Sequence, residues 1–436
     1  MALARIGLIV LISLFSVVAT HAQTSDILEI RITKGVEGAL PIAIVPFDWR
    51  ADGPPPADVT AIITADLRGS GRFDAMPPAD LPSRPATFAD INFKDWRLHR
   101  MDYLVIGAIT QIDVDSFAVE FRVIDVVSNK QLAGFRIPTT VANLRSTAHH
   151  ISDLIYESIL KLKGAFATRI AYVTVVKSGK ESRYQLQVAD SDGYNARTIL
   201  DTREPLLSPA WSPQGDRIAY VSFEDHNSAI YVQNIRTGKR EKVVSGNGIN
   251  SSPSFSPDGR RLVMTRSLEG NPDIYVLDLA SGKQTRLTSH AAIDTEARWM
   301  AHGNHIVFTS DRGGGPQIYK LPSNGGEPAR LTFNMGAYNS RASLSPDGKS
   351  MAVVHGGDGG YRIAVVDLNS GNFNVLTNSH LDESPSFAPN GATIIYATMG
   401  SNGAELAAVS VDGKVRQRLA LQKGEVREPA WGPIQE

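Results

Sequence analysis

Short apolar stretches alternate with turn sequences from about residue 165 onward, and the pattern repeats. A strand that ends in an aromatic residue or leucine precedes a turn resembling Ser-Pro-Asp-Gly, and this position recurs every 43 to 45 residues. The repeated positions are Trp211, Phe255, Trp299, Leu344, Phe387 and Trp431. A fixed period of this length is typical of propeller blades or of a solenoid.

Each repeat also contains further β-rich segments, such as residues 218–221 and 230–232. In the turns between them, Pro presets φ and Gly accepts the left-handed conformation that ends the turn. Four short antiparallel strands in each repeat favour a β-propeller over a helical solenoid. The aromatic residues and turns are then expected to build the blades and to carry no chemistry.

The two ends of the repeat region complement each other. Residues 170–173 resemble a second strand that lacks a first strand before it, and residues 429–433 resemble a first strand with nothing after it. We therefore predict an all-β six-bladed propeller over residues 164–436, closed when the C-terminal strand pairs into the first blade. Such closure removes free sheet edges.

The region before the repeats, residues 23–163, has a different pattern. Apolar runs at residues 40–47 and 103–109 predict buried strands, and alternation at residues 117–123 predicts a half-buried strand. A turn at residues 128–130 is expected to lead into a partner strand that ends near Ile137.

Two helices are expected in the same region. Asp58 is placed to cap a helix that continues to Leu67. Asn143 is placed to cap a second helix, whose apolar residues fall at steps of three and four and which Gly164 would end. Strands and helices together predict a small mixed α/β N-terminal domain.

The first residues have the pattern of an export signal. Arg5 is followed by an almost unbroken apolar run of about 14 residues, and Thr20 and Ala22 place small residues where a signal peptidase reads. The run is short against the ~20 residues that span a bilayer. We therefore predict that residues 1–22 are a cleaved signal peptide and that the mature chain begins at Gln23.

Composition excludes several classes of function. Lys and Arg number 44 against 45 Asp and Glu, so no basic excess points to a nucleic-acid partner. The chain has no cysteine, which excludes disulfides, thiolate nucleophiles and zinc–cysteine sites.

No catalytic motif emerges either. The G-x-S-x-G and H-E-x-x-H patterns are absent. His149 and His150 are adjacent on the second predicted helix, and neighbours one apart do not face each other, so they make a poor metal pair. We expect no enzyme activity, no cofactor and no protein-built metal site.

Propeller geometry gives an expected binding surface. Connections between blades run to the central channel, and here they lie just before each repeated aromatic position. Carboxylates at Asp294, Glu296, Asp382, Glu383 and Glu428 would then converge at one mouth. The residues predicted to bind a partner there are Ile249, Asn250, Ser252, Thr295, Glu296, Tyr338, Asn339, Asp382, Glu383, Arg427 and Glu428.

Three alternatives remain open for this mouth. A carboxylate-lined channel is compatible with a secreted hydrolase or lyase, since paired carboxylates hydrolyse glycosides. The same oxygens suit a calcium ion, although no dedicated cage is present. A purely structural propeller without a ligand is the third alternative.

The order of motifs along the chain is more specific than the repeats alone. The signal is followed by PIAIVPFDW at 41–49, ADLRGSGRF at 65–73, KGAFATRIAY at 163–172, SPAWSP at 208–213 and TSDR at 309–312. This order resembles the TolB family along essentially the whole mature chain.

The resemblance implies a non-enzymatic periplasmic component of the Tol-Pal system, working as a monomer. It implies binding of the lipoprotein Pal at the propeller mouth, and of TolA and the inner-membrane Tol complex through the N-terminal region, so that the membrane is contacted only through proteins. It also implies a role in outer-membrane integrity and in invagination at cell division, with residues 23–34 switching as Pal binds. Ile249, Asn250, Ser252, Thr295 and Glu296 match family positions that help bind Pal, although the best-known relatives carry His where this chain has Ile249.

Overall fold

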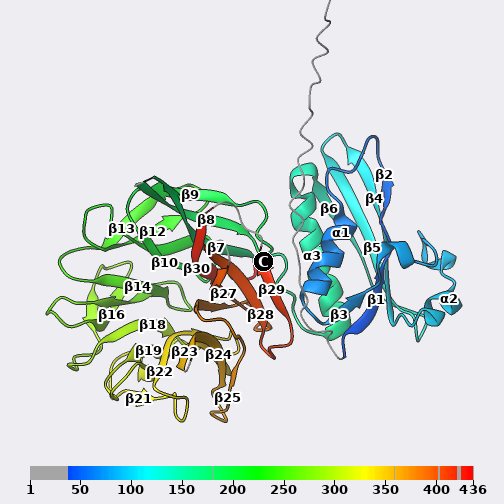
Figure 1. Ribbon diagram of the computed structural model, residues 1–436. Helices are drawn as coiled ribbons and strands as arrows, with labels where there is room; N and C mark the ends of the chain where they lie inside the picture. The colour runs from blue at the N-terminus through cyan, green and yellow to red at the C-terminus, as the bar shows by residue number, and fades with distance from the viewer. Residues whose placement is uncertain (1–37, 180, 358, 401–402, 420–423, 436) are drawn as a thin grey trace, which may run out of the picture.

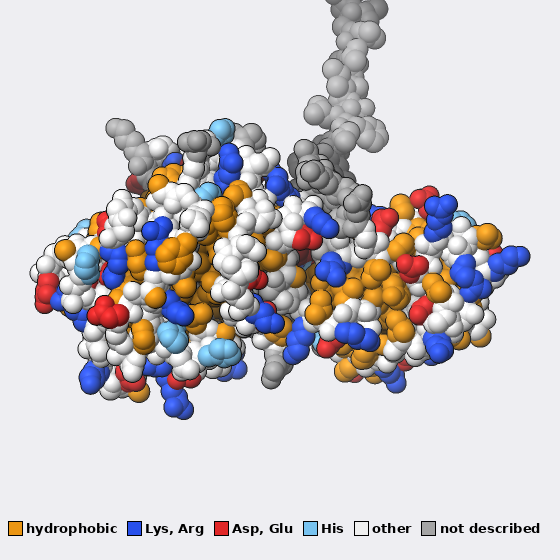
Figure 2. All heavy atoms as spheres, turned by 90° about the horizontal axis from the view of Figure 1, so that it is seen from below, with side chains coloured by type: hydrophobic (Ala, Val, Ile, Leu, Met, Phe, Trp, Pro, Cys, Tyr) orange, Lys and Arg blue, Asp and Glu red, His pale blue; other side chains and the backbone are white. Residues whose placement is uncertain are grey.

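The computed structural model describes residues 38–179, 181–357, 359–400, 403–419 and 424–435. The predicted signal peptide, its cleavage point between Ala22 and Gln23, and the segment 23–34 lie outside these residues. None of the helices in the described ranges is long and apolar enough to cross a membrane. Figures 1 and 2 show two lobes side by side, and hydrophobic side chains gather on the face of the N-terminal lobe seen in Figure 2.

The N-terminal lobe is a mixed sheet with helices on both faces. Its strands pair in the order β3-β1-β4-β5-β6, with β2 also on β4; β1 is parallel to both β3 and β4, and the β4-β5-β6 pairs are antiparallel. The elements are β1 (Leu40–Ile44), β2 (Asp48–Arg50), α1 (Val59–Gly69), β3 (Phe73–Ala75), η1 (Pro78–Asp80), η2 (Phe88–Asp90), α2 (Phe93–Leu98), β4 (Tyr103–Asp113), β5 (Ser116–Asp125), β6 (Lys130–Thr140), η3 (Val141–Asn143) and α3 (Leu144–Leu160).

Apolar packing explains this arrangement. The helices α1 and α3 bury Ile63 and Ile151 against Val105 and Val119 of the sheet. On the other face, Trp96 of α2 is fully buried in a second cluster. Figure 1 shows α1 and α3 on the side of the sheet that faces the propeller.

The helix ends differ in part from the sequence prediction. Asp58 caps α1 as predicted, accepting a hydrogen bond from the Ala61 N–H at 2.9 Å, but the helix continues to Gly69. Asn143 makes no side-chain cap bond, because the chain enters α3 through the 3-10 turn η3. The prediction that Gly164 ends this helix was wrong: α3 ends at Leu160, and Lys161 takes the left-handed conformation with φ of 60°.

Gly164 has a different structural role. A Cβ there would lie 2.1 Å from the Asp153 carboxylate, so the linker passes directly over α3. Asp153 accepts backbone N–H groups from Phe166 and Ala167 at 2.8 and 3.0 Å. These two hydrogen bonds hold the linker between the two domains against α3.

The second lobe is a propeller of six four-stranded sheets, as predicted. Blade 1 is β30-β7-β8-β9, and blades 2 to 6 follow in chain order. The strands are β7 (Arg169–Ser178), β8 (Glu181–Asp190), β9 (Arg197–Thr202), β10 (Leu206–Trp211), β11 (Arg217–Ser222), β12 (Ala229–Asn234), β13 (Arg240–Val244), β14 (Asn250–Phe255), β15 (Arg261–Arg266), β16 (Asp273–Asp278), β17 (Gln284–Arg286), β18 (Asp294–Trp299), β19 (His305–Ser310), β20 (Gln317–Pro322), β21 (Ala329–Arg330), β22 (Tyr338–Leu344), β23 (Ser350–Gly357), β24 (Gly360–Asp367), β25 (Phe373–Val375), β26 (Asp382–Phe387), β27 (Thr393–Gly400), β28 (Gly403–Ser410), β29 (Arg416–Leu419) and β30 (Glu425–Trp431).

The predicted ring closure is present. Strand β30 pairs antiparallel with β7, and Trp431 lies opposite Ile170 in this pair (Figure 1). The repeated aromatic residues join neighbouring blades: the Trp211 indole N–H donates to the Ala430 carbonyl at 3.0 Å. Apolar side chains of adjacent blades also share clusters, as Ile230 and Leu262 do.

The N-terminal lobe lies on one face of the ring, beside blades 1 and 6. Asn390, in the turn between β26 and β27, donates to the Lys163 carbonyl at 3.2 Å. The Gln417 side chain donates to the Gly69 carbonyl, and a Cβ at Gly71 would lie 1.9 Å from Val415. Asn390 follows the end of the innermost strand β26, and Val415 and Gln417 lie where the outermost strand β29 begins, which is on the same face because the strands of a blade are antiparallel. The face where the innermost strands begin is therefore the opposite one.

Candidate protein-binding face of the propeller

We call the face where the six innermost strands begin the mouth. The residues predicted to form connections there begin the strands instead: Asn250, Tyr338 and Asp382 are the first residues of β14, β22 and β26. The strands include these residues because the pairing with the second strand of the blade reaches them, as in the pair of Asn250 with Arg266 of β15. The expectation that these residues lie in loops was therefore wrong.

Each innermost strand has one left-handed residue near its start. These residues are Ser208, Ser252, Glu296, Arg341, Ser384 and Glu428, with φ between 50° and 57°. The strand register breaks around each of them, as in a β-bulge. None is glycine, so each costs roughly 1–2 kcal/mol of backbone strain. The repetition in all six blades shows that the ring geometry requires this bend.

Three of these residues form ion pairs across the ring. The Arg341 Nε lies 3.0 Å from Glu296, and its Nη1 lies 3.0 Å from Glu428. The Arg341 backbone N–H also donates to Glu296 at 3.0 Å. The pair with Glu296 connects the neighbouring blades 5 and 4, whereas the pair with Glu428 connects blades 5 and 1, which are not neighbours. The nearby carboxylates, Glu428 first, raise the pKa of Arg341.

Arg298 completes this group, which we call the channel cluster: Glu296, Arg298, Arg341 and Glu428. The Arg298 Nη1 donates to the Ala297 carbonyl at 3.1 Å, and burial lowers the pKa of its guanidinium. Two arginines and two glutamates balance each other, so the cluster has no net charge. The predicted convergence of carboxylates is thus correct for Glu296 and Glu428, but both are engaged by arginine.

Of the remaining predicted carboxylates, Glu383 also lies near Arg341 and helps to raise its pKa, whereas Asp294 and Asp382 are buried inside the blades. Asp294 is fully buried and forms a bidentate pair with Arg312 at 2.8 and 2.9 Å. Asp382 is also fully buried, and neither of its carboxylate oxygens has a hydrogen-bond partner among the described residues. Glu383 is half-buried beside it.

Several predicted partner-binding residues are buried inside the blades. Asn250 is fully buried, accepts a bond from the Arg266 Nε at 2.8 Å and donates to the Ser228 carbonyl at 2.8 Å. Asn339 is equally buried and bonds to His355 at 2.9 Å. These side chains hold strands together and are not on the surface of the mouth.

Other predicted residues are more accessible. Thr295 is half-buried and bonds to Thr265 at 3.3 Å. Tyr338 is half-buried against the Tyr361 ring, at 5.0 Å between centroids. Ser252 is nearly buried, whereas Arg427 is exposed and pairs with Glu425.

Exposed apolar residues surround the mouth, and the sequence analysis named only one of them. Ile249 and Ile293 are each 49% exposed and directly precede an innermost strand, as does the exposed Leu381. Leu268 and Met399 lie beside them at the ends of second strands, since the Ser267 and Met399 N–H groups bond to Ile249 and Leu381. We call Ile249, Leu268, Ile293, Leu381 and Met399 the apolar rim. Exposed apolar groups gathered in this way mark protein-binding surfaces.

Two family models match the chain. The TolB amino-terminal domain matches residues 28–132, and the TolB beta propeller domain matches residues 156–435. The chain is also 60% identical over 426 residues to the Tol-Pal system protein TolB of Thioalkalivibrio sulfidiphilus, covering 97% of each chain. The chain belongs to the TolB family.

Further relatives match more than nine tenths of the chain. The Tol-Pal system protein TolB of Nitrosococcus oceani is 59% identical over 408 residues, which cover 93% of this chain and 94% of that one. The crystal structure of TolB from Acinetobacter baumannii superimposes with a TM-score of 0.86 at 43% identity, covering 93% of this chain and all of that one. The two-lobed TolB architecture is therefore shared.

Proposed function

We propose that this TolB-family protein is a periplasmic component of the Tol-Pal system and binds the lipoprotein Pal at the propeller mouth. The observation that carries this proposal is the apolar rim around a channel in which Arg341 already pairs with Glu296 and Glu428. A surface with apolar groups at its edge and mutually paired charges near its centre suits another protein. Membership of the TolB family supports Pal as that protein.

The placement of the lobes supports the same proposal. Because the N-terminal lobe contacts the opposite face through Asn390 and Gln417, it does not cover the rim. One face of the ring would then bind the partner, and the N-terminal domain, which would respond to this binding, contacts the other face.

The N-terminal region is proposed to contact TolA and the inner-membrane Tol complex. Residues 23–34, which follow the predicted signal peptide, would switch state as Pal binds. The protein would act as a monomer that supports outer-membrane integrity and invagination at division, and it would reach the membrane only through its protein partners.

A hydrolase or lyase in the channel is the weaker alternative. Its support was the expected ring of carboxylates, and Glu296 and Glu428 are instead held by Arg341. A glycosidase requires one carboxylic acid and one carboxylate placed around a substrate. We therefore propose a binding role without catalysis.

Calorimetric titration of the mature protein with the soluble domain of Pal from the same organism tests the proposal. Ile293→Glu and Leu381→Glu place charges on the rim and are expected to weaken binding at least tenfold. Phe373→Glu is the matched control, because Phe373 is similarly exposed at 39% but lies on the outermost strand of blade 5. Failure of the wild type to bind folded Pal, or unchanged binding by both rim variants, would contradict the proposal.

A further inference from the structure

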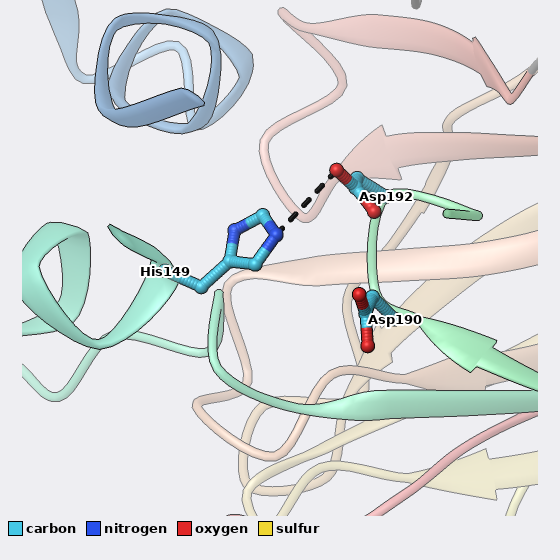
Figure 3. A group of neighbouring side chains, drawn as sticks. All are labelled: His149, Asp190 and Asp192. Carbon is cyan, nitrogen blue, oxygen red and sulfur yellow. Dashed lines mark ion pairs between the residues drawn. The ribbon is translucent and has the colours of Figure 1, made fainter. Parts of the chain in front are cut away.

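A buried group of ionisable side chains lies where α3 meets blade 1. His149 projects from α3 toward Asp190, at the end of β8, and Asp192, in the turn that follows (Figure 3). One ligand atom from each of the three lies within 4.8 Å of the other two. His149 is only 1% exposed, so the group is inside the contact between the lobes.

Asp66 of α1 orients the imidazole. The His149 Nδ1 lies 2.8 Å from the Asp66 carboxylate, which also accepts a bond from the Ser152 hydroxyl at 2.7 Å. A carboxylate that holds the proton on Nδ1 leaves a lone pair on Nε2. Histidines that ligate metals almost always have such a partner behind the ring.

The other ring nitrogen points into the group without a hydrogen-bond partner. The His149 Nε2 is buried and unpartnered among the described residues, and it lies 3.6 Å from the Asp192 Oδ2. This distance is too long for a hydrogen bond. It is close to the separation of about 3.3 Å between two ligands on a tetrahedral ion with bonds of about 2.0–2.1 Å.

The charges of the group are also unbalanced. Asp66, Asp190 and Asp192 bring three negative charges when ionised, and Arg145 brings one positive charge. Arg169 and Asp153 also interact with the group and add one charge of each sign, so −2 remains when His149 is neutral. The Arg145 guanidinium contacts Asp192, lies 3.7 Å from Asp190 and stacks on the Tyr194 ring at 3.9 Å. One divalent cation would balance the remaining charge, and buried charge without compensation is costly.

We propose that His149, Asp190 and Asp192 form a binding site for a divalent transition-metal ion such as zinc, with Asp66 as the partner that orients the imidazole. One nitrogen and two carboxylate oxygens suit zinc, whereas calcium and magnesium take oxygen ligands. A pocket between the lobes is lined by Asp66 and Asp192, two residues of this group. The ion would link α3 directly to blade 1.

Titration of the metal-free, full mature protein with Zn²⁺ tests the site. Calorimetry is expected to show one ion per chain, and Co²⁺ is expected to give the visible absorption of a tetrahedral complex. His149→Gln should remove this binding and Asp192→Asn should weaken it at least tenfold. His150→Gln is the matched control, because His150 is the exposed neighbour on the same helix and should leave binding unchanged.

Two further variants separate ligands from supporting residues. Asp66→Asn should weaken Zn²⁺ binding about 10- to 100-fold without changing the stoichiometry. Arg145→Gln removes the competing cation and should tighten binding. A merely structural salt-bridge group would not respond in opposite directions to these two changes.

The proposal does not depend on Pal binding and can be overturned by itself. No Zn²⁺ binding by the wild type, or equal affinity in His149→Gln, would show that it is wrong. Anomalous scattering at the zinc edge from wild-type crystals needs no variant: an ion on His149, Asp190 and Asp192 supports the site, and an ion only elsewhere overturns it.

Discussion

Removal of Arg341 tests whether the channel cluster holds the ring together. Arg341→Met keeps an unbranched side chain of similar length but removes the charge. The substitution breaks the two ion pairs of 3.0 Å. Glu296 and Glu428, whose side chains are 20% and 13% exposed, then have Arg298 as a nearby cation. Removing one partner from a buried pair costs about 3–5 kcal/mol, and from an exposed pair less than about 1 kcal/mol; the Arg341 side chain is 35% exposed, so its pairs lie between these limits.

We therefore expect the free energy of unfolding of the propeller to fall by about 2–3 kcal/mol. Urea unfolding followed by tryptophan fluorescence measures this change. Arg427→Met is the control, since Arg427 is exposed and pairs only with Glu425 two residues away; its loss should cost less than about 1 kcal/mol. A loss below about 1 kcal/mol for Arg341→Met, or full additivity with Glu428→Gln, would refute the reasoning.

Three further predictions concern single buried positions. Asp382→Asn should stabilise the propeller by about 1 kcal/mol in thermal unfolding, because it removes a buried carboxylate that has no partner among the described residues. Blade 3 already has an asparagine, Asn250, at the corresponding position. Burial raises the pKa of Asp153 from 3.8 to about 6, so the folded protein holds a proton that the unfolded chain has released. Stability should then fall by about 3 kcal/mol as the pH rises from about 3 to 7, and Asp153→Asn should remove this slope in urea titrations at several pH values. Gly71→Ala should loosen the contact between the lobes by about 1–3 kcal/mol, seen as faster amide exchange around Val415, because the added Cβ would overlap that side chain and φ is 67°.

Each of these predictions has an opposing result. Destabilisation by Asp382→Asn would mean that the carboxylate has a partner that the amide cannot replace. An unchanged pH slope in Asp153→Asn would assign the slope to other groups. Unaltered exchange around Val415 in Gly71→Ala would show that the two lobes are not held by this contact.

The propeller could be predicted because its signals are local. The spacing from Trp211 to Trp431 and the turns of Pro, Asp and Gly depend on residues close together in the chain, and the unmatched strands at the two ends implied closure. Helix ends were less predictable, because they depend on tertiary contacts: Gly164 is required by its approach to Asp153, not by the end of α3.

The candidate site was predictable only as a region. Which side chains face outward depends on strand alternation, and the bulge at Ser252 interrupts that alternation. Ser252 and Pro253 are therefore both buried, whereas Ile249, which precedes the strand, is exposed beside the buried Asn250. The pairing of Arg341 with glutamates of two other blades has no signal in a single sequence, because the blades meet only in the closed ring.

The group around His149 shows the same limit. The prediction that His149 and His150 do not face one another is consistent with the structure, which buries one and exposes the other. The expectation of no metal site considered only spacing along the chain. Asp66, the nearest partner of His149, is 83 residues away, so only the fold places these groups together.

The pairing of β30 with β7 also sets an order of events during synthesis. Blades 2 to 6 are built from strands that follow one another, so each can form as soon as its own residues are available. Blade 1 is different, because its innermost strand is β30. Val175 of β7 pairs with Glu425 of β30, which is synthesised about 250 residues later. Until then the edge of β7 is open to pairing with other chains, and contacts so distant in sequence form slowly. Loss of residues 424–431 after folding would reopen that same edge, so a single cut near one end of the sequence would expose a strand that was made near the middle.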